Sequence, residues 1–297
     1  MLLEALLLNL MQQNEILTSD KMLLPSTYEY IIIGDVHGCI DELKSLLQKQ
    51  DFLVNQNNLL TITPKNRHKS IVLLGDFVDK GSDEKLTETI EFIYYNYQHL
   101  NKERKRFYLI LGNHEIMVYR YITNDSTLIV NPKTIENKEK YYNTVTLLEK
   151  KPHLKKLFLE LYSECVTDYK YSYGENFSVT LTHAPCPEKY LSQKDETSKK
   201  KMVKCVSRSK NPQMPLDELI PYVHEEAKEN QHYHIFGHLS QPNIRQYKNK
   251  ICIDTSAIYG DTLSCAIVKE DKLTFDSVPF EKKQIKGQQT YNLLFDF

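Results

Sequence analysis

Short runs of apolar residues recur along the chain, and most of them end in a polar cluster. The runs occupy residues 30–33, 71–74, 107–111, 178–182, 234–236 and 251–253. Unbroken apolar runs of this length, rich in β-branched side chains, are typical of strands buried on both faces. The pattern therefore predicts that these segments form strands of a sheet that is covered on both sides.

Segments with helical spacing lie between the early runs. Residues 40–50 carry Leu43, Leu46 and Leu47 on one helical face, and residues 83–100 repeat the pattern. Apolar positions spaced by three and four residues predict amphipathic helices. Strand and helix alternate in this part of the chain, which favours an α/β fold with helices packed on the sheet.

The connections between the predicted strands differ in length and composition. Two long stretches, 119–170 and 185–230, are rich in Lys, Asn, Tyr or Pro, and the first contains a helical piece at 152–164. We interpret both as cap-like insertions over the ligand-binding edge of the sheet and not as separate domains. The expected organisation is an N-terminal extension at 1–27, a main domain at 28–280 and a C-terminal tail at 281–297.

The first residues are strongly apolar without forming a typical export signal. Residues 1–11 read MLLEALLLNLM, which contains Glu4, has no basic beginning and is followed by no cleavage site. The stretch is also too short to span a bilayer, and no other segment approaches that length. We predict an amphipathic helix that packs on the body of the protein or on a partner.

Composition excludes little beyond a strongly charged partner. The formal net charge is −1, so no global field favours nucleic acid or an anionic membrane. The basic run 101–106 is short and lacks interleaved aromatic residues, so we interpret it as a solvated connection and not as a nucleic-acid patch. The six cysteines form no C-x-x-C pair, which favours reduced thiols and a cytoplasmic location. Export as a bacterial effector has no recognised signal to support it.

Polar residues with metal-binding side chains follow the predicted strands. The set consists of two carboxylates, one amide and three imidazoles: Asp35, His37, Asp76, Asn113, His183 and His238. In an α/β sheet, ligands bind beyond the carboxyl ends of the strands, so these side chains are expected to meet. A glycine precedes most of them, which lets the backbone turn sharply off the strand. The mixed oxygen and nitrogen set suits Mn²⁺, Fe or Zn better than Ca²⁺ or Mg²⁺.

Three sequence blocks carry a resemblance to a known family. GDVHG at 34–38, GDFVDKG at 75–81 and GNHE at 112–115 resemble the signature blocks of the phosphoprotein phosphatase family of metallophosphoesterases. That family includes serine/threonine phosphatases, their bacterial and phage relatives, and symmetrical diadenosine tetraphosphatases. His183 and His238 lie in segments similar to its two later histidine blocks. The resemblance covers residues 34–268 and implies a calcineurin-like αββα sandwich with helical cap insertions.

The resemblance also implies the ligands of two divalent metal ions, of which Mn²⁺ is the preferred candidate and Fe or Zn the alternatives. One ion would be held by Asp35, His37 and Asp76. The second would be held by Asp76, Asn113, His183 and His238. A carboxylate shared by both ions offsets the repulsion between them, and a hydroxide bridging the ions would attack phosphorus.

The remaining site residues are expected to move a proton and to bind phosphate. His114 would be the general acid, and Asp79 would orient its imidazole. Lys80 stands where the family usually has arginine and would contact phosphate, together with Asn113, while Tyr259 would overhang the metals. Glu115 is expected to support the site without binding metal. Candidates for a second phosphate-binding cation are Arg120, Arg208 and Arg245.

The substrate is open to three interpretations. We favour a protein phosphatase that acts on phosphoserine or phosphothreonine, or on phosphotyrosine. The alternative is a hydrolase of diadenosine tetraphosphate, nucleotides or RNA ends, and Leu111 before GNHE resembles the residue of bacterial-type members and dinucleotide hydrolases. A phosphate-recognising scaffold without turnover is disfavoured, because every expected ligand is present. The sequence leaves the oligomeric state open.

Overall fold

The computed structural model describes residues 22–124, 142–191, 193–205 and 232–281. The predicted helix at 1–11 lies outside these ranges. So do nearly all of the predicted C-terminal tail and parts of both insertions, at 125–141 in the first and at 206–230 in the second. The boundaries assigned to the main domain and to both insertions therefore stay predictions.

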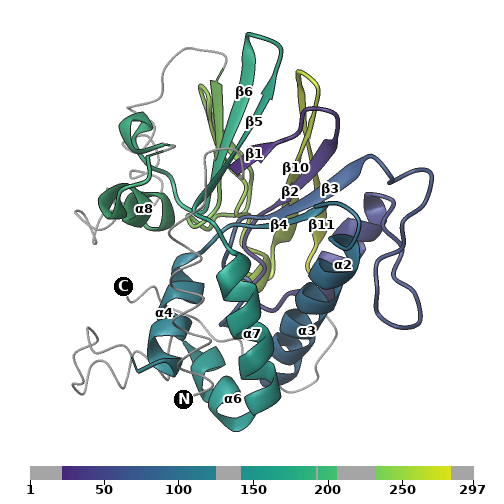
Figure 1. Ribbon diagram of the computed structural model, residues 1–297, viewed down its shortest axis with the longest axis vertical. Helices are drawn as coiled ribbons and strands as arrows, with labels where there is room; N and C mark the ends of the chain where they lie inside the picture. The colour runs from purple at the N-terminus through teal and green to yellow at the C-terminus, as the bar shows by residue number, and fades with distance from the viewer. Residues whose placement is uncertain (1–21, 125–141, 192, 206–231, 282–297) are drawn as a thin grey trace.

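Two sheets form the centre of the protein (Figure 1). The five-stranded sheet has the order β11 (Lys272–Pro279), β10 (Thr262–Lys269), β2 (Glu29–Ile33), β3 (Lys69–Leu73) and β4 (Phe107–Leu109). The six-stranded sheet has the order β1 (Leu23–Leu24), β5 (Asp168–Tyr173), β6 (Phe177–Thr182), β7 (His232–Phe236), β9 (Lys250–Cys252) and β8 (Arg245–Tyr247). Strands β2, β3 and β4 run parallel, as do β6, β7 and β9.

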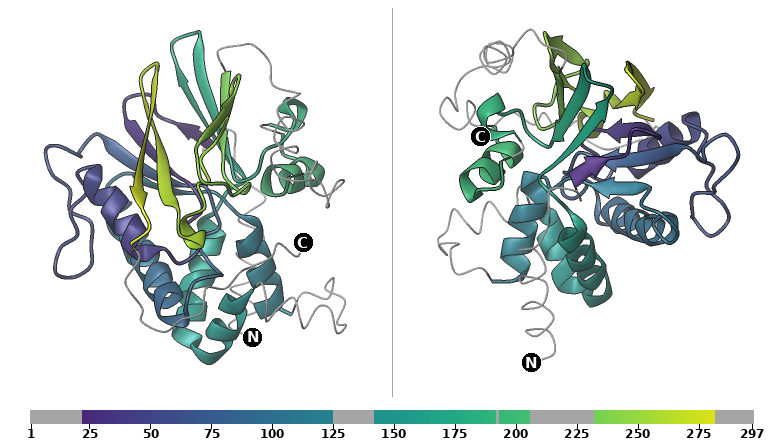
Figure 2. Two further views of the ribbon diagram at one scale, coloured as in Figure 1. Left: turned by 180° about the vertical axis from the view of Figure 1, so that it is seen from behind. Right: turned by 45° about the horizontal axis from the view of Figure 1, so that its top comes forward.

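Helices cover the outer face of the five-stranded sheet, and a smaller helical layer lies beside the six-stranded sheet (Figures 1 and 2). The layer on the five-stranded sheet contains α2 (Ile40–Lys49), α3 (Asp83–Leu100), α4 (Asn113–Ile122), α6 (Asn143–Lys150) and α7 (Pro152–Glu164). Beside the six-stranded sheet lie α8 (Glu196–Val203) and the short η3 (Glu188–Tyr190), while η4 (Ala257–Tyr259) precedes β10. The layers are therefore those of the expected αββα sandwich.

Strand β2 shows why an unbroken apolar run was needed. Ile31 and Ile33 belong to the core between the five-stranded sheet and the helices, whereas Tyr30 and Ile32 belong to the core between the two sheets. Successive side chains of a strand point to opposite faces, so a strand covered on both sides needs apolar residues at every position. The prediction of doubly buried strands is confirmed for β2.

The first long insertion adds helices to an existing layer. Within residues 119–170, helices α6 and α7 pack against α3 and α4. Leu148 and Phe158 are fully buried in the core on that side of the five-stranded sheet. These helices therefore extend the helical layer, and α6 begins next to the loop that follows β3, as described below.

None of the helices in the described ranges is both long enough and apolar enough to cross a membrane.

Shortening a side chain between the two sheets is expected to destabilise the protein. Ile32 has 1% of its surface exposed, so Ile32→Ala leaves a cavity that neighbouring strands cannot fill. We expect the free energy of unfolding to fall by about 2–5 kcal/mol. Urea denaturation would measure it. The control is Leu53→Ala, since Leu53 is 51% exposed and its truncation should change stability by less than about 0.5 kcal/mol. Equal stability of both variants would contradict this account of the core.

Candidate active site

Side chains from both sheets meet beyond the carboxyl ends of the parallel strands. Asp35 and His37 follow β2, and Asp76 follows β3. His183 and His238 follow β6 and β7 of the other sheet. Because the two sheets pack face to face, these strand ends converge at one rim of the sandwich.

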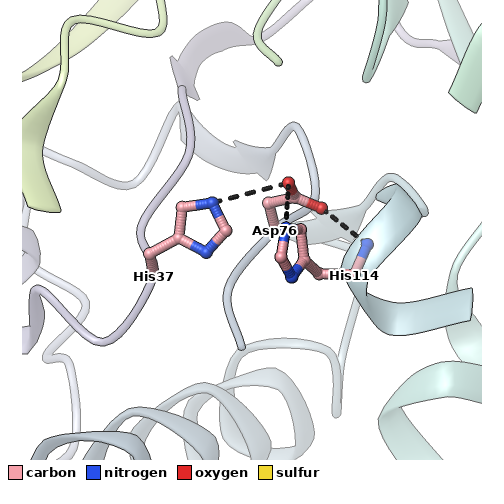
Figure 3. Close-up of side chains that lie close together, drawn as sticks. All are labelled: His37, Asp76 and His114. Atoms are coloured by element: carbon pink, nitrogen blue, oxygen red, sulfur yellow. Dashed lines mark hydrogen bonds and ion pairs between the residues drawn. The ribbon is translucent and has the colours of Figure 1, made fainter. Parts of the chain in front are cut away.

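Asp76 lies at the centre of this group. Its Oδ2 is 3.5 Å from His37 Nε2, and its Oδ1 is 3.4 Å from His183 Nε2. Figure 3 shows His37, Asp76 and His114 pointing toward one another. The carboxylate therefore has imidazole nitrogens on both sides, as a bridging ligand requires.

A second cluster of donor atoms surrounds His183. Its Nε2 is 2.9 Å from the Asn113 Oδ1 and 3.2 Å from His238 Nδ1. Donor atoms of Asp76, His183 and His238 all lie within 4.8 Å of one another. Four of the expected ligands of the second ion are thus close enough to share one cation.

The donors near His37 are arranged differently from the expected set. The compact group here consists of His37, Asp76 and His114, again within 4.8 Å. Asp35 is buried nearby and accepts a hydrogen bond from the backbone N–H of His238 at 3.1 Å. Its carboxylate therefore holds the turn that carries His238, and the assignment of Asp35 to the first ion stays a prediction.

Backbone carbonyls orient two of the imidazoles. His37 Nδ1 lies 2.7 Å from the carbonyl oxygen of Val78, and His183 Nδ1 lies 2.8 Å from that of Leu74. A ring nitrogen that donates to a carbonyl leaves the opposite nitrogen, Nε2, facing the centre. His183 Nε2 then faces the oxygen acceptors of Asn113 and Asp76, an arrangement of lone pairs that a cation satisfies.

The loops that carry these residues have an uncommon backbone conformation. The φ angles are 43° at His37, 50° at Asp76, 64° at Asp79, 66° at Lys80 and 68° at His238. Residues other than glycine rarely adopt positive φ, and such residues gather at functional sites. Five residues of the site therefore adopt this conformation in the turns that carry its side chains.

Close packing explains two of the glycines that precede site residues. A Cβ added to Gly112 would collide with the carboxylate of Asp76, and one added to Gly237 would collide with that of Asp35. Both glycines are therefore needed for the approach of backbone to carboxylate. The sequence analysis expected a sharp turn here, and the contacts give the steric reason.

Glu115 lies in the first turn of α4 and supports the site through its carboxylate. Its carboxylate accepts hydrogen bonds from the backbone N–H groups of Asp76, Phe77 and Gly112, at 2.8, 2.9 and 2.9 Å. One buried side chain thereby joins the loop after β3 to the start of α4. The two loops that carry Asp76 and Asn113 are fixed relative to each other.

The electrostatics of the cluster fit divalent cations. Burial and the neighbouring Asp254 raise the pKa of Asp35 well above its usual range. Burial lowers the pKa of His183, but the Asp76 carboxylate outweighs this and raises it to about 10. Buried negative charge therefore attracts protons to the site, and a metal ion would displace them because its imidazole ligands must be neutral. Carboxylate, amide and imidazole together suit a divalent transition metal.

The expected acid and its partner are in direct contact. His114 Nδ1 lies 2.7 Å from Asp79 Oδ2, and both residues are buried. The backbone N–H of His114 donates to Asp76 Oδ1 at 3.1 Å, while His114 Nε2 lies 3.9 Å from Asp76 Oδ2. The bond to Asp79 turns Nε2 toward the centre, where a general acid has to act.

The two residues expected at the mouth of the site also meet. Lys80 Nζ lies 5.4 Å from the centre of the Tyr259 ring, and Tyr259 is 48% exposed. Burial lowers the pKa of Lys80, but Tyr259 and the carboxylates of Asp76 and Asp254 raise it above its ordinary value. A stable cation therefore stands at the rim of the cluster.

The candidates for a second phosphate-binding cation stay predictions. Arg245 donates to the backbone carbonyls of Leu239 and Asn243. Arg120 lies in the last turn of α4, and Arg208 lies outside the described residues.

The sequence analysis assigned no role to Asp254, although the position of this residue in the sequence indicated one. Asp254 follows the apolar run 251–253, as other site residues follow their strands. It is buried, and Ser240 Oγ and the backbone N–H of Ser256 both donate to its Oδ1 at 3.2 Å. Its charge acts on Asp35 and Lys80, so it belongs to the electrostatics of the site.

Comparison with known proteins agrees with this geometry. The family model described as calcineurin-like phosphoesterase matches residues 29–254. A bis(5'-nucleosyl)-tetraphosphatase PrpE [asymmetrical] of Oceanobacillus iheyensis is 28% identical over 240 residues, which are 78% of this chain and 86% of that protein. The protein of the same description from Bacillus mycoides is 24% identical over 239 residues, 80% of this chain and 89% of its own.

A solved structure has a similar fold. It is described as the crystal structure of a candidate diadenosine tetraphosphatase and superposes with a TM-score of 0.54 at 18% identity, covering 88% of this chain and 98% of that chain. The family model spans most of the chain, and the resemblance drawn from the three sequence blocks is confirmed at this level. The chain belongs to the calcineurin-like phosphoesterase family, hydrolases that act on phosphoric esters.

Proposed function

We propose that the protein hydrolyses dinucleoside polyphosphates, with diadenosine tetraphosphate as the representative substrate. The observation that carries the reaction type is the meeting of Asp76, His183 and Asn113 beside the buried pair His114 and Asp79. Support for the substrate class comes from relatives named as tetraphosphatases, which match about four-fifths of the chain. This reverses the preference of the sequence analysis, which had put protein dephosphorylation first.

The metal ions would be held by the residues proposed from the sequence. Asp35, His37 and Asp76 would bind one divalent ion, and Asp76, Asn113, His183 and His238 the other. Bound there, a pair of divalent ions supplies Lewis acidity and lowers the pKa of water. We propose Mn²⁺ as the native metal, with Fe or Zn as alternatives.

The chain's own residues would bind phosphate and move a proton. Lys80 attracts the polyphosphate at the mouth, and Asn113 contacts the phosphoryl group. Tyr259 offers an exposed ring for contact with the substrate. The oxygen of a water molecule bonds to phosphorus and the water gives up one proton to solvent, while the bond from that phosphorus to the bridging oxygen breaks. His114 Nε2 donates its proton to the departing oxygen, while Asp79 stabilises the imidazolium. For diadenosine tetraphosphate cut asymmetrically, the products are ATP and AMP.

One observation favours a second candidate, the dephosphorylation of protein side chains. A serine alkoxide is a much stronger base than a phosphate oxygen and gains more from a proton donor. The buried contact of 2.7 Å between His114 and Asp79 suits such a leaving group. The cytoplasmic location proposed from the cysteines is compatible with either substrate.

Parallel assays distinguish the two candidates. With Mn²⁺ added, we expect diadenosine tetraphosphate to yield ATP and AMP, measured by ion-exchange chromatography. Phosphoserine and phosphothreonine peptides should release phosphate much more slowly, measured by a colorimetric assay. Release of phosphate from peptides with the dinucleotide left intact would replace the first candidate by the second.

Two substitutions separate catalysis from metal binding. We expect His114→Asn to lower kcat by roughly 10²–10⁴-fold, since it removes the proton donor. Its metal content, measured by elemental mass spectrometry, should match that of the unaltered protein. Asp76→Asn should reduce both activity and metal content, because it weakens the carboxylate shared by both ions. Loss of metal from the His114 variant would instead make His114 a ligand, in line with its proximity to His37 and Asp76.

A further inference from the structure

The loop after β3 is held from outside by the start of α6. This loop carries Asp79 and Lys80, and both have left-handed backbone conformations, with φ of 64° and 66°. Residues other than glycine rarely adopt this conformation, and two of them in succession are energetically unfavourable. Contacts from another part of the chain have to hold such a turn in place.

Thr144 makes two hydrogen bonds to Asp79. The Asp79 backbone N–H donates to Thr144 Oγ1 at 2.8 Å, and the Thr144 backbone N–H donates to Asp79 Oδ1 at 3.0 Å. The other carboxylate oxygen, Oδ2, faces His114 Nδ1. Thr144 therefore fixes both the backbone of Asp79 and the rotation of its carboxylate. Both residues are fully buried, so water does not compete for these bonds.

Asn143 holds the next two residues of the same loop. Its Oδ1 accepts from the Lys80 backbone N–H at 2.9 Å, and its Nδ2 donates to the Gly81 carbonyl oxygen at 2.8 Å. A single side-chain amide thereby bridges the backbone N–H of Lys80 and the carbonyl oxygen of the next residue, Gly81. The bridge fixes the backbone from which the Lys80 side chain departs.

The residue before them packs on the acid itself. The ring of Tyr142 lies 5.4 Å from that of His114, centre to centre, and the rings are tilted by 54°. Tyr142, Asn143 and Thr144 thus contact His114, Lys80 and Asp79, respectively. The hydrogen bonds of Thr144 and Asn143 join residues more than sixty positions apart in the chain.

We propose that Thr144 and Asn143 are positioning residues for the general acid and the phosphate-binding lysine. Thr144 acts through Asp79, whose second oxygen aims the His114 imidazole at the leaving group. Asn143 acts through the backbone of Lys80. The inference rests on the proposed role of His114 as proton donor, but it holds for a dinucleotide or a phosphoprotein substrate alike.

The test compares leaving groups on aryl phosphates. p-Nitrophenolate departs readily without a proton, whereas phenolate needs one, so a misplaced acid slows phenyl phosphate selectively. We expect Thr144→Val to lower kcat for phenyl phosphate on the order of 10-fold, with a much smaller change for p-nitrophenyl phosphate and little change in KM. Thr144→Ser, which keeps the hydroxyl, should restore the rate.

A matched control lies on the same helix. Thr146 is half-buried and lies two residues further along α6. Thr146→Val makes the same chemical change away from the loop. It should leave both aryl phosphate rates unchanged. An equal fall for both leaving groups in Thr144→Val, or a fall that Thr144→Ser does not reverse, would overturn the proposal, because either result indicates a general structural role.

A measurement without turnover keeps the proposal testable if aryl phosphates are not hydrolysed. The His114 Nδ1 proton, bonded to Asp79, should give a low-field proton resonance in the unaltered protein and in Thr146→Val. We expect this resonance to be lost or broadened in Thr144→Val. An unchanged resonance would overturn the proposal, whereas failure on dinucleotides alone would overturn only the proposed substrate.

For Asn143 the expected effect is on phosphate binding. Asn143→Ala frees the Lys80 backbone, so we expect KM for p-nitrophenyl phosphate to rise several-fold with a smaller change in kcat. Asn143→Asp keeps the acceptor for the Lys80 N–H and should restore part of the affinity. A fall confined to kcat would contradict the assignment to Lys80.

Discussion

Buried negative charge at the junction of the two sheets is the constraint on which the site depends. Asp35, Asp76 and Asp254 are all withdrawn from water within this one rim. Ionised carboxylates in such a place need partners, because an unpaired buried charge costs several kcal/mol. His37 and His183 supply part of the compensation through Asp76. Divalent cations would supply the rest, which explains why so many strand ends in both sheets carry a ligand type.

Because the buried charges come from both sheets, the geometry of the site depends on the distance between the sheets. Asp76 and its support Glu115 come from the five-stranded side, while His183 comes from the six-stranded side. Their separation is set by the side chains packed between the sheets, among them Ile32 and Val179. The apolar core and the polar rim are therefore two parts of one arrangement, since a shift of a single strand would separate atoms that now lie within 4.8 Å.

Much of this arrangement could be predicted from the sequence because it follows from local patterns of apolar and polar residues. Doubly buried strands require unbroken apolar runs, and the expected ligand residues follow those runs directly. Strands that alternate with polar residues escaped notice, such as β5, which begins at Asp168, and the half-exposed β11. The contacts of Thr144 and Asn143 were also invisible, because they join distant segments through tertiary packing. The choice of substrate could not be predicted, since the same ligands and acid serve phosphomonoesters and phosphoanhydrides alike.

The left-handed turns have a consequence for the evolution of this protein. Aspartate, lysine and histidine at positive φ destabilise the fold locally. Glycine would adopt the same backbone conformation at a lower cost in free energy. Asp79 and Lys80 lie side by side in this state. Selection for thermal stability alone would therefore tend to replace the residues of these turns first, and it would yield a more stable protein without activity.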